Sequence, residues 1–143
     1  MAEKNESYAY FAIKGAFDPS DISAKVGVLP TKAFAAGELI PKANKKREFS
    51  GWFLYSRLNR SNAIELHVAD VLDQMDAKKN EFKELSIELG GLIELVGFFP
   101  EFYPGIFFER ELVERLAYYA LSVDFDFYFP SAVEGVGPEG TTT

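Results

Sequence analysis

Hydrophobic residues gather in short stretches that predict β-strands at five places along the chain. In three of them, apolar side chains occupy both odd and even positions, which is typical of strands covered on two faces. The last stretch, LSVDFDFYF, instead alternates strictly between apolar and polar residues. The expected strands are 7–15, 49–58, 92–99, a short one at 105–108, and 121–129.

Apolar residues three and four positions apart predict helices between these strands. Asp18, Pro19 and Gly27 have the order of an N-cap, a first helical residue and a C-terminal glycine. Asn62 and Glu65 have the spacing of a capping box. The expected helices are 18–27, 62–75, 82–89 and 109–120, and residues 28–48 show no sustained period, which predicts a long loop.

This order of elements predicts an α+β fold in a single domain. Short links between strands favour antiparallel neighbours, so we expect a mixed, mostly antiparallel sheet with helices packed against it. The domain is expected over residues 7–129. Residues 1–6 are expected to be a flexible N-terminus, and residues 130–143, which have little to bury, a disordered tail.

Composition narrows the possible partners. The net charge of −7 repels a phosphate backbone, so no nucleic acid is expected. The basic cluster Lys42, Lys45, Lys46 and Arg47 is interpreted as part of a solvated loop. No apolar run is long enough for a membrane span, and the charged first residues do not resemble a secretory signal. With no cysteine in the chain, we expect a cytoplasmic protein.

The alternation in residues 121–129 puts two aspartates on one face of the last strand. Leu121, Val123, Phe125, Phe127 and Phe129 should face inward, and Asp124, Asp126 and Tyr128 outward. The two aspartates would be about 6.5 to 7 Å apart along the strand. We interpret them as solvent-facing. A divalent cation or an acid–base pair there remains an alternative, because aspartate is disfavoured in strands.

No catalytic residue can be named from the sequence. His67 is the only histidine, and its position beside the apolar stripe of a helix indicates packing. No serine lies in a Gly-x-Ser-x-Gly pattern, and no glycine-rich phosphate-binding loop is present. The sequence therefore predicts no cofactor and no recognisable set of metal ligands.

The aromatic residues, 14 Phe and 7 Tyr, suggest a binding surface. Trp52 and Tyr55 either pack in the core or form a platform for a ligand or partner. Phe102 and Tyr103 lie in the aromatic turn FFPEFYPGIFF, which is too rich in rings to bury them all.

Several of these segments together resemble a protein family. DPSDISAKVGVLPTKAFAAGE, FSGWFLYSR and ERELVERLAYYALSVDFDFYF are similar to the bacterial family known as domain of unknown function 4279. The resemblance extends from about residue 8 to residue 129. The chain has Phe34 at a position where tryptophan is common in the family. The matching positions are Pro30, Thr31, Gly37, Glu38, Trp52, Asp126 and Tyr128. The resemblance implies no activity, but it draws attention to Asp126 and Tyr128.

Two functional hypotheses follow. The first is a non-enzymatic module that binds an unknown protein partner, as an immunity protein or adaptor does. The alternative is a protein that binds a small molecule or a divalent metal through the acidic face of the last strand. A homodimer is possible through that strand if it lies at a sheet edge.

Overall fold

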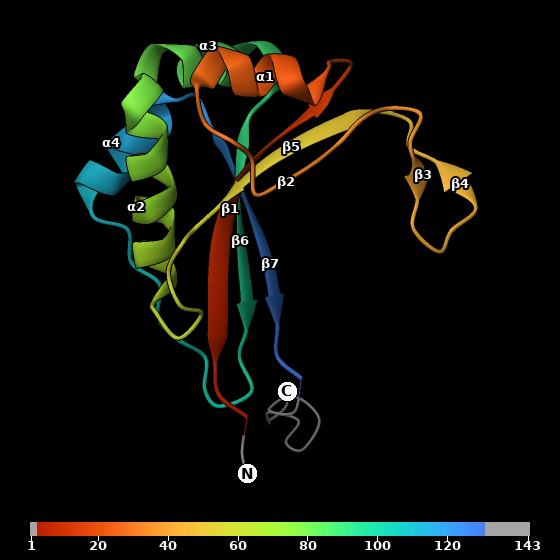
Figure 1. Ribbon diagram of the computed structural model, residues 1–143. Coiled ribbons are helices and arrows are strands. Elements are labelled where there is room, and N and C mark those ends of the chain that lie inside the picture. The colour runs from red at the N-terminus through yellow and green to blue at the C-terminus, as the bar shows by residue number, and fades with distance from the viewer. Residues whose placement is uncertain (1–2, 131–143) are drawn as a thin grey trace.

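The computed structural model describes residues 3–130, which form one α+β domain (Figure 1). The strands are β1 (Glu6–Gly15), β2 (Lys32–Phe34), β3 (Leu39–Ile40), β4 (Lys45–Lys46), β5 (Ser50–Tyr55), β6 (Leu92–Phe98) and β7 (Ser122–Tyr128). The helices are α1 (Pro19–Val26), α2 (Ile64–Met75), the short 3-10 helix η1 (Asp76–Lys78), α3 (Lys79–Leu89) and α4 (Arg110–Tyr118).

Five strands form the main sheet in the order β2-β5-β1-β6-β7. The first three ladders are antiparallel, and β7 runs parallel to β6 because α4 carries the chain back between them. β3 and β4 form a separate two-stranded hairpin. The predicted α+β fold with a mixed, mostly antiparallel sheet is therefore confirmed.

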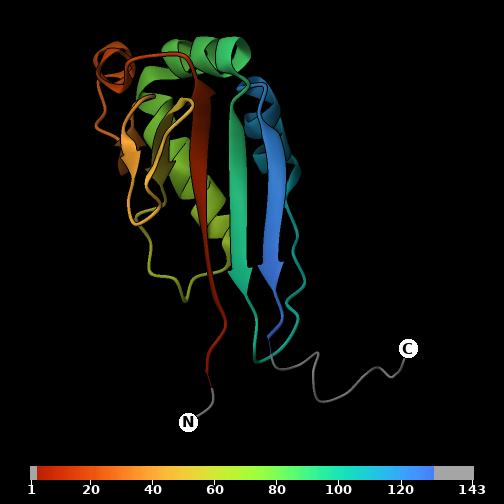
Figure 2. The same ribbon diagram turned by 90° about the vertical axis from the view of Figure 1, so that its right-hand side faces the viewer.

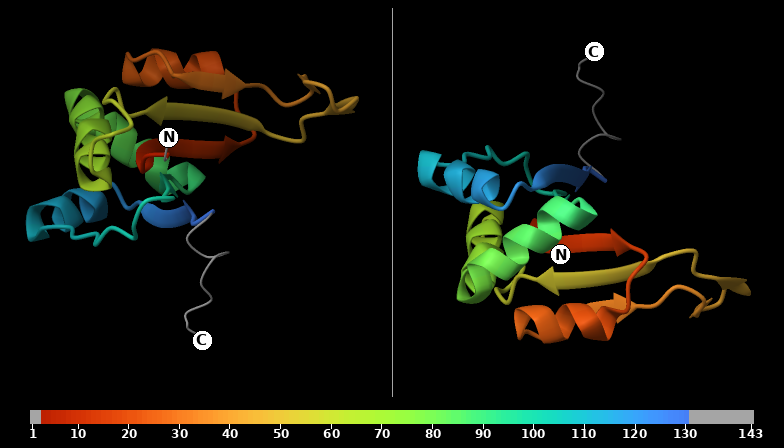
Figure 3. Two further views of the ribbon diagram at one scale, coloured as in Figure 1. Left: turned by 90° about the horizontal axis from the view of Figure 1, so that it is seen from below. Right: turned by 90° about the horizontal axis from the view of Figure 1, so that it is seen from above.

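The helices cover one face of the sheet only. α2 and α4 lie on this side, whereas the β3–β4 hairpin projects from the other (Figures 1 and 3). The main core fills the space between sheet and helices, where Phe11, Trp52, Phe82 and Leu95 are fully buried. None of the helices of residues 3–130 lies over the opposite face of β1, β6 and β7 (Figure 2).

Local sequence explains where α1 begins and ends. The Asp18 carboxylate accepts a hydrogen bond from the Ser20 amide, Pro19 is the first helical residue, and Gly27 ends the helix in the left-handed conformation (φ 68°). Ile22 and Val26 are the buried edge, as their spacing predicts. This helix was correctly located from the sequence.

Three local predictions are wrong. Residues 28–48 contain β2 and the β3–β4 hairpin in place of an unstructured loop, because these short strands are stabilised by pairing and carry no period of their own. Residues 105–108 form no strand. The α2 N-cap is Ala63, without a side-chain bond, because the Asn62 amide group instead donates to the Asn59 carbonyl.

Burial on the sheet also differs from the prediction. β1 and β6 are central strands, yet only one face of each is covered by helices, and Tyr8, Tyr10 and Glu94 on the other face are half-buried. β7 is an edge strand. Its apolar side chains are therefore only partly buried, and Phe125, expected to face inward, is 57% exposed.

The first strand, β1, begins at Glu6 and the last, β7, ends at Tyr128. Residues 1–2 and 131–143, which include most of the expected tail, lie outside the described residues. Between residues 3 and 130, none of the helices combines the length and the apolar character needed to span a bilayer.

Candidate functional site

A row of four side chains crosses the uncovered face of the sheet. Tyr10 on β1 is the register partner of Tyr55 on β5 and of Glu94 on β6, and Glu94 is in turn the partner of Asp124 on β7. Side chains at directly opposed positions lie on the same face, so the row passes from two phenols to two carboxyls. We call this row, together with Tyr8, Asp126 and Tyr128, the tyrosine–carboxylate face.

Three tyrosines form a stack at one side of this face. The Tyr10 and Tyr55 ring centroids are 4.5 Å apart and the rings nearly parallel, and the Tyr8 ring lies 5.8 Å from Tyr55. The Arg60 guanidinium lies 4.2 Å from the centre of the Tyr8 ring. The stack therefore already holds one cation over an aromatic face, a geometry with favourable electrostatics.

Three carboxyl groups lie beside this stack. Burial, followed by a hydrogen bond to Asp124 and the charges of Asp124 and Asp126, raises the pKa of Glu94 to about 7. None of the three forms an ion pair with a cation of residues 3–130. The surface thus concentrates negative charge that no neighbouring side chain within 4.0 Å neutralises.

The phenols respond to the same environment. Burial, then the charge of Glu94, raises the pKa of Tyr10 to about 12. A hydrogen bond from the Tyr128 hydroxyl to Asp126 raises the pKa of Tyr128. Asp126 and Tyr128, the two positions emphasised by the family resemblance, therefore contact each other on this face.

The structure separates the other sequence candidates from this face. Trp52 lies on the helix-covered side of β5, is fully buried, and donates from Nε1 to the Ser23 hydroxyl. It therefore cannot form an exposed platform with Tyr55, and its role is core packing. His67 is also fully buried, with Nδ1 2.7 Å from the Ser56 hydroxyl, as expected for a packing histidine.

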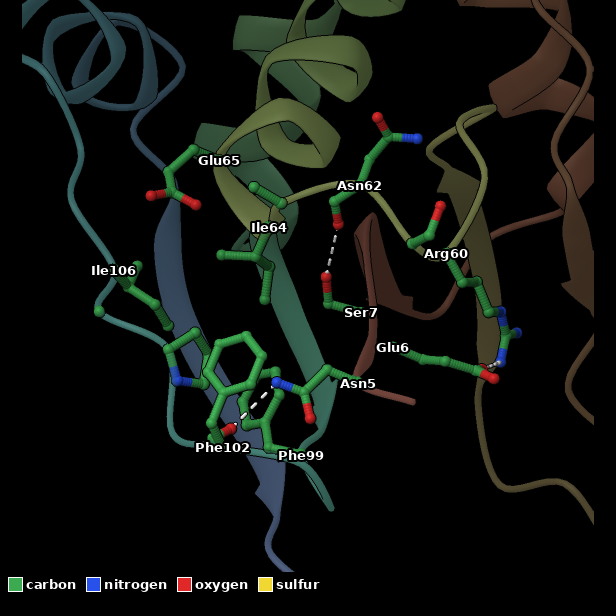
Figure 4. Close-up of a pocket in the computed structure, with 14 residues that line it drawn as sticks. Asn5, Glu6, Ser7, Arg60, Asn62, Ile64, Glu65, Phe99, Phe102 and Ile106 are labelled. Carbon is green, nitrogen blue, oxygen red and sulfur yellow. Dashed lines mark hydrogen bonds and ion pairs between the residues drawn. The ribbon is translucent and has the colours of Figure 1, made fainter. Parts of the chain in front are cut away.

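Phe102 and Tyr103 lie in the segment between β6 and α4 and are 58% and 57% exposed. Phe102 borders a hollow of about 250 Å³ at the start of α2, with Ile64, Phe99 and Ile106 as further apolar walls (Figure 4). The Asn5 amide group donates to the Phe102 carbonyl and closes one side. This hollow can accept an apolar side chain, but it is separate from the tyrosine–carboxylate face.

The described residues contain no group of three or more His, Asp or Glu side chains arranged to hold a metal ion. The carboxyls of Glu94, Asp124 and Asp126 are thus neighbours without forming such a group. What the arrangement can do chemically is attract a cation and place it against aromatic rings.

Sequence reasoning missed Tyr8, Tyr10 and Glu94. In the stretch SYAYF the two tyrosines are two residues apart, the spacing of side chains on one face of a strand. In the apolar stretch LIELVGFF, Glu94 is the single acidic residue. Apolar residues at odd and even positions predict that both stretches are covered on two faces, and this prediction hides the three side chains as part of a surface. The parallel pairing of β6 with β7 was also needed to bring Glu94 beside Asp124.

Comparison with known proteins adds the family. A family model described as "Domain of unknown function (DUF4279)" matches residues 5–130. The chain belongs to this family. Membership in the domain of unknown function 4279 family agrees with the resemblance found in the sequence and assigns no activity. The search of curated proteins and the search of solved structures each found no match.

Proposed function

We propose that this protein is a non-enzymatic interaction module that binds a basic segment of another protein on its tyrosine–carboxylate face. The observation that carries the proposal is the row Tyr55–Tyr10–Glu94–Asp124, in which unpaired carboxyls adjoin stacked rings on the uncovered face of the sheet. An immunity protein or an adaptor would use this face to hold its partner.

Arginine and lysine are the partner side chains that this chemistry favours. A guanidinium can form paired hydrogen bonds with a carboxylate and stack on an aromatic ring at the same time. Tyr10 and Tyr55 are half-buried on a rigid sheet, so they lose little conformational freedom on binding. Complementary charge also accelerates association and disfavours acidic partners.

The raised pKa of Glu94 gives this binding a pH dependence. At pH 6 Glu94 is largely protonated, and at pH 8 largely charged, because its pKa is about 7. A bound cation favours the charged form, so affinity for a basic segment should increase with pH over this range. The tyrosine–carboxylate face would then release a proton as the partner binds.

The test uses a capped hexa-arginine peptide as the probe, with isothermal titration calorimetry at pH 8. The variant Asp124→Asn with Asp126→Asn removes two carboxylates from the face and should weaken binding about tenfold, equivalent to about 1.4 kcal/mol. The matched control, Glu88→Gln with Glu114→Gln, removes the same charge from exposed positions on α3 and α4.

Equal weakening in both variants would show a general effect of net charge and contradict the proposal. A parallel titration with calcium chloride tests the divalent-metal alternative. That alternative would be favoured if the aspartate variant lost calcium binding while wild type and variant bound the hexa-arginine peptide with equal affinity. A circular dichroism spectrum and a thermal melt of each variant establish that it is folded.

A further inference from the structure

A second hollow, of about 390 Å³, lies between the β3–β4 hairpin and the β1–β5–β2 end of the uncovered sheet face. Figure 2 shows the hairpin in front of this end of the sheet. Its walls carry five cationic side chains and one carboxylate, Glu48. The five cations are Lys14, Lys32, Lys45, Lys46 and Arg47. They come from three separate segments, because the fold adds Lys14 and Lys32 to the basic run at 45–47.

These cations have no anionic partner within the described part of the chain. None of the five forms an ion pair there, whereas Lys25, Arg57 and Arg115 elsewhere in the protein each do. The Nε atom of Arg47 is buried and has no hydrogen-bond partner among residues 3–130. In a protein of net charge −7, this unpaired buried donor beside four exposed lysines favours an anionic ligand in the hollow.

Aromatic rings hold several of these cations in place. The Arg47 guanidinium lies 3.8 Å from the centre of the Phe34 ring, and the Lys32 ammonium 5.5 Å from that of Phe53. A cation–π contact attracts the charge but uses none of its directional N–H···O bonds. The N–H groups of these side chains thus remain available to an anion.

The backbone of the hairpin is anchored, so the points from which its cationic side chains extend are defined. The Gly37 amide donates to the Arg47 carbonyl and the Arg47 amide to the Glu38 carbonyl, which join the two ends of the hairpin. The Ser50 hydroxyl accepts from the Ala36 amide and donates to the Phe17 carbonyl, which attaches the hairpin base to β5. A preorganised set of donors binds an anion at lower entropic cost.

We infer that this hollow is a binding site for a small molecule that carries a di- or triphosphate group. Five cations against one carboxylate leave an excess of positive charge around the hollow. A ligand with several adjacent negative charges matches this excess, whereas a ligand with one carboxylate group does not. Arginine offers paired donors and lysine a compact charge to phosphate oxygens. The volume is within the range of small-ligand sites.

The experiment titrates inorganic pyrophosphate and tripolyphosphate into the full-length protein at fixed ionic strength, with calorimetry and thermal melts as readouts. The variant Lys14→Gln with Lys32→Gln should bind at least about tenfold more weakly than wild type. A second variant, Lys45→Gln with Lys46→Gln, changes only exposed hairpin positions and should show a similar loss. The control, Lys42→Gln with Lys79→Gln, removes two exposed charges outside the hollow and should bind within about twofold of wild type.

Each contrary result overturns the inference. Absence of pyrophosphate and tripolyphosphate binding to wild type at physiological salt would exclude the site. Equal weakening in the control and the hollow variants would show a general charge effect. Tighter binding of hexa-glutamate or of a single-stranded oligonucleotide than of either phosphate would assign the hollow to a macromolecule. The Lys45→Gln, Lys46→Gln variant leaves unchanged Glu94, Asp124, Asp126 and also Lys14, whose charge lowers the pKa of Glu94, so its result is independent of the hexa-arginine test.

Discussion

Glu94 and Asp124 are register partners on the parallel strands β6 and β7, with their carboxyls side by side on the uncovered face of the sheet. Each additional negative charge there costs free energy, because burial and the neighbouring carboxylates oppose it. Within residues 3–130 neither carboxyl has an ion-pair partner, so the pair carries a local electrostatic penalty that the charge of Lys14 offsets only in part. A cationic partner can relieve that penalty, which connects the fold to the proposed function.

The first prediction concerns stability and pH. The pKa of Glu94 is about 7 in the folded protein against an ordinary value of 4.5, so between these values the folded state binds a proton that the unfolded state has lost. The free energy of unfolding should therefore fall as pH rises through this window. Glu94→Gln should be more stable than wild type at pH 8 by about 1–3 kcal/mol and nearly equal at pH 4.5.

Urea unfolding of both proteins at pH 4.5, 6 and 8 measures this difference. Glu88→Gln, an exposed position on α3, serves as the control and should show no such pH-dependent gain. Parallel stability curves for Glu94→Gln and wild type would refute the raised pKa of Glu94 in the folded protein.

The second prediction concerns Trp52. Because its ring is fully buried between β5 and the helices, its fluorescence should be blue-shifted and resist acrylamide quenching until the protein unfolds. Addition of hexa-arginine should leave the emission nearly unchanged. Strong quenching in the folded state would place Trp52 at the surface and contradict this packing.

A third prediction compares two aspartates of α2. Asp70 is 8% exposed and accepts hydrogen bonds from the Arg57 amide and guanidinium and from Gln74. Asp70→Ala should lower the free energy of unfolding by about 2 kcal/mol, since it removes the charged acceptor of the Arg57 amide, the Arg57 guanidinium and Gln74. Asp73→Ala should cost less than about 1 kcal/mol, because Asp73 is exposed and Arg115 retains Asp76. Equal costs in chemical denaturation would be inconsistent with a special role for Asp70.

Asp70 should also affect the acid limb of the stability curve, which is the fall in the free energy of unfolding at low pH. Burial alone would raise its pKa, but hydrogen bonds and charge from Arg57 outweigh burial and lower it. Its contribution to stability is thus present above the ordinary pKa of 3.8 and is lost as pH falls through the lowered folded value. In Asp70→Asn this acid limb should be shallower than in wild type, as followed by circular dichroism, and an unchanged limb would argue against it.

The fourth prediction concerns Gly51, which lies under the ring of Phe34. A Cβ atom at this position would come 2.7 Å from atoms of Phe34 and Phe53, so one of these rings must move. Gly51→Ala should destabilise the protein by about 1–3 kcal/mol through overpacking. Gly105→Ala, where a Cβ atom would meet nothing within 4 Å, is the control in the same thermal melts. A melting temperature of Gly51→Ala equal to that of the control would show that the rings adapt freely.

Much of the fold could be predicted because the longer helices and strands have a recognisable pattern of apolar and capping residues in the sequence. The Asp18–Pro19 start and the Gly27 end determine α1, and the stripe of Val68, Val71 and Leu72 determines α2. By contrast, β2 and the β3–β4 hairpin have two or three residues each and exist through their pairing, so no periodicity reveals them. The absent strand at 105–108 shows the converse, since apolar residues without a partner strand form none.

The candidate site was only partly predictable, because it depends on strand order. Alternation correctly placed Asp124, Asp126 and Tyr128 on one face of the last strand. Nothing in the sequence indicated that β6 and β1 lie between β7 and β5. That order brings Glu94 and Tyr10 into the row and turns isolated residues into a surface.

The most direct test of the central claim is an NMR titration of wild-type protein, with labelled tyrosine rings and glutamate carboxyls, by hexa-arginine at pH 8. The account predicts that the signals of Tyr8, Tyr10, Tyr55 and Glu94 shift together along one saturating curve, while those of Tyr118 and Tyr119 near the helices do not move. Shifts confined to the helix side, or spread evenly over the molecule, would contradict a cation-binding face on the open side of the sheet.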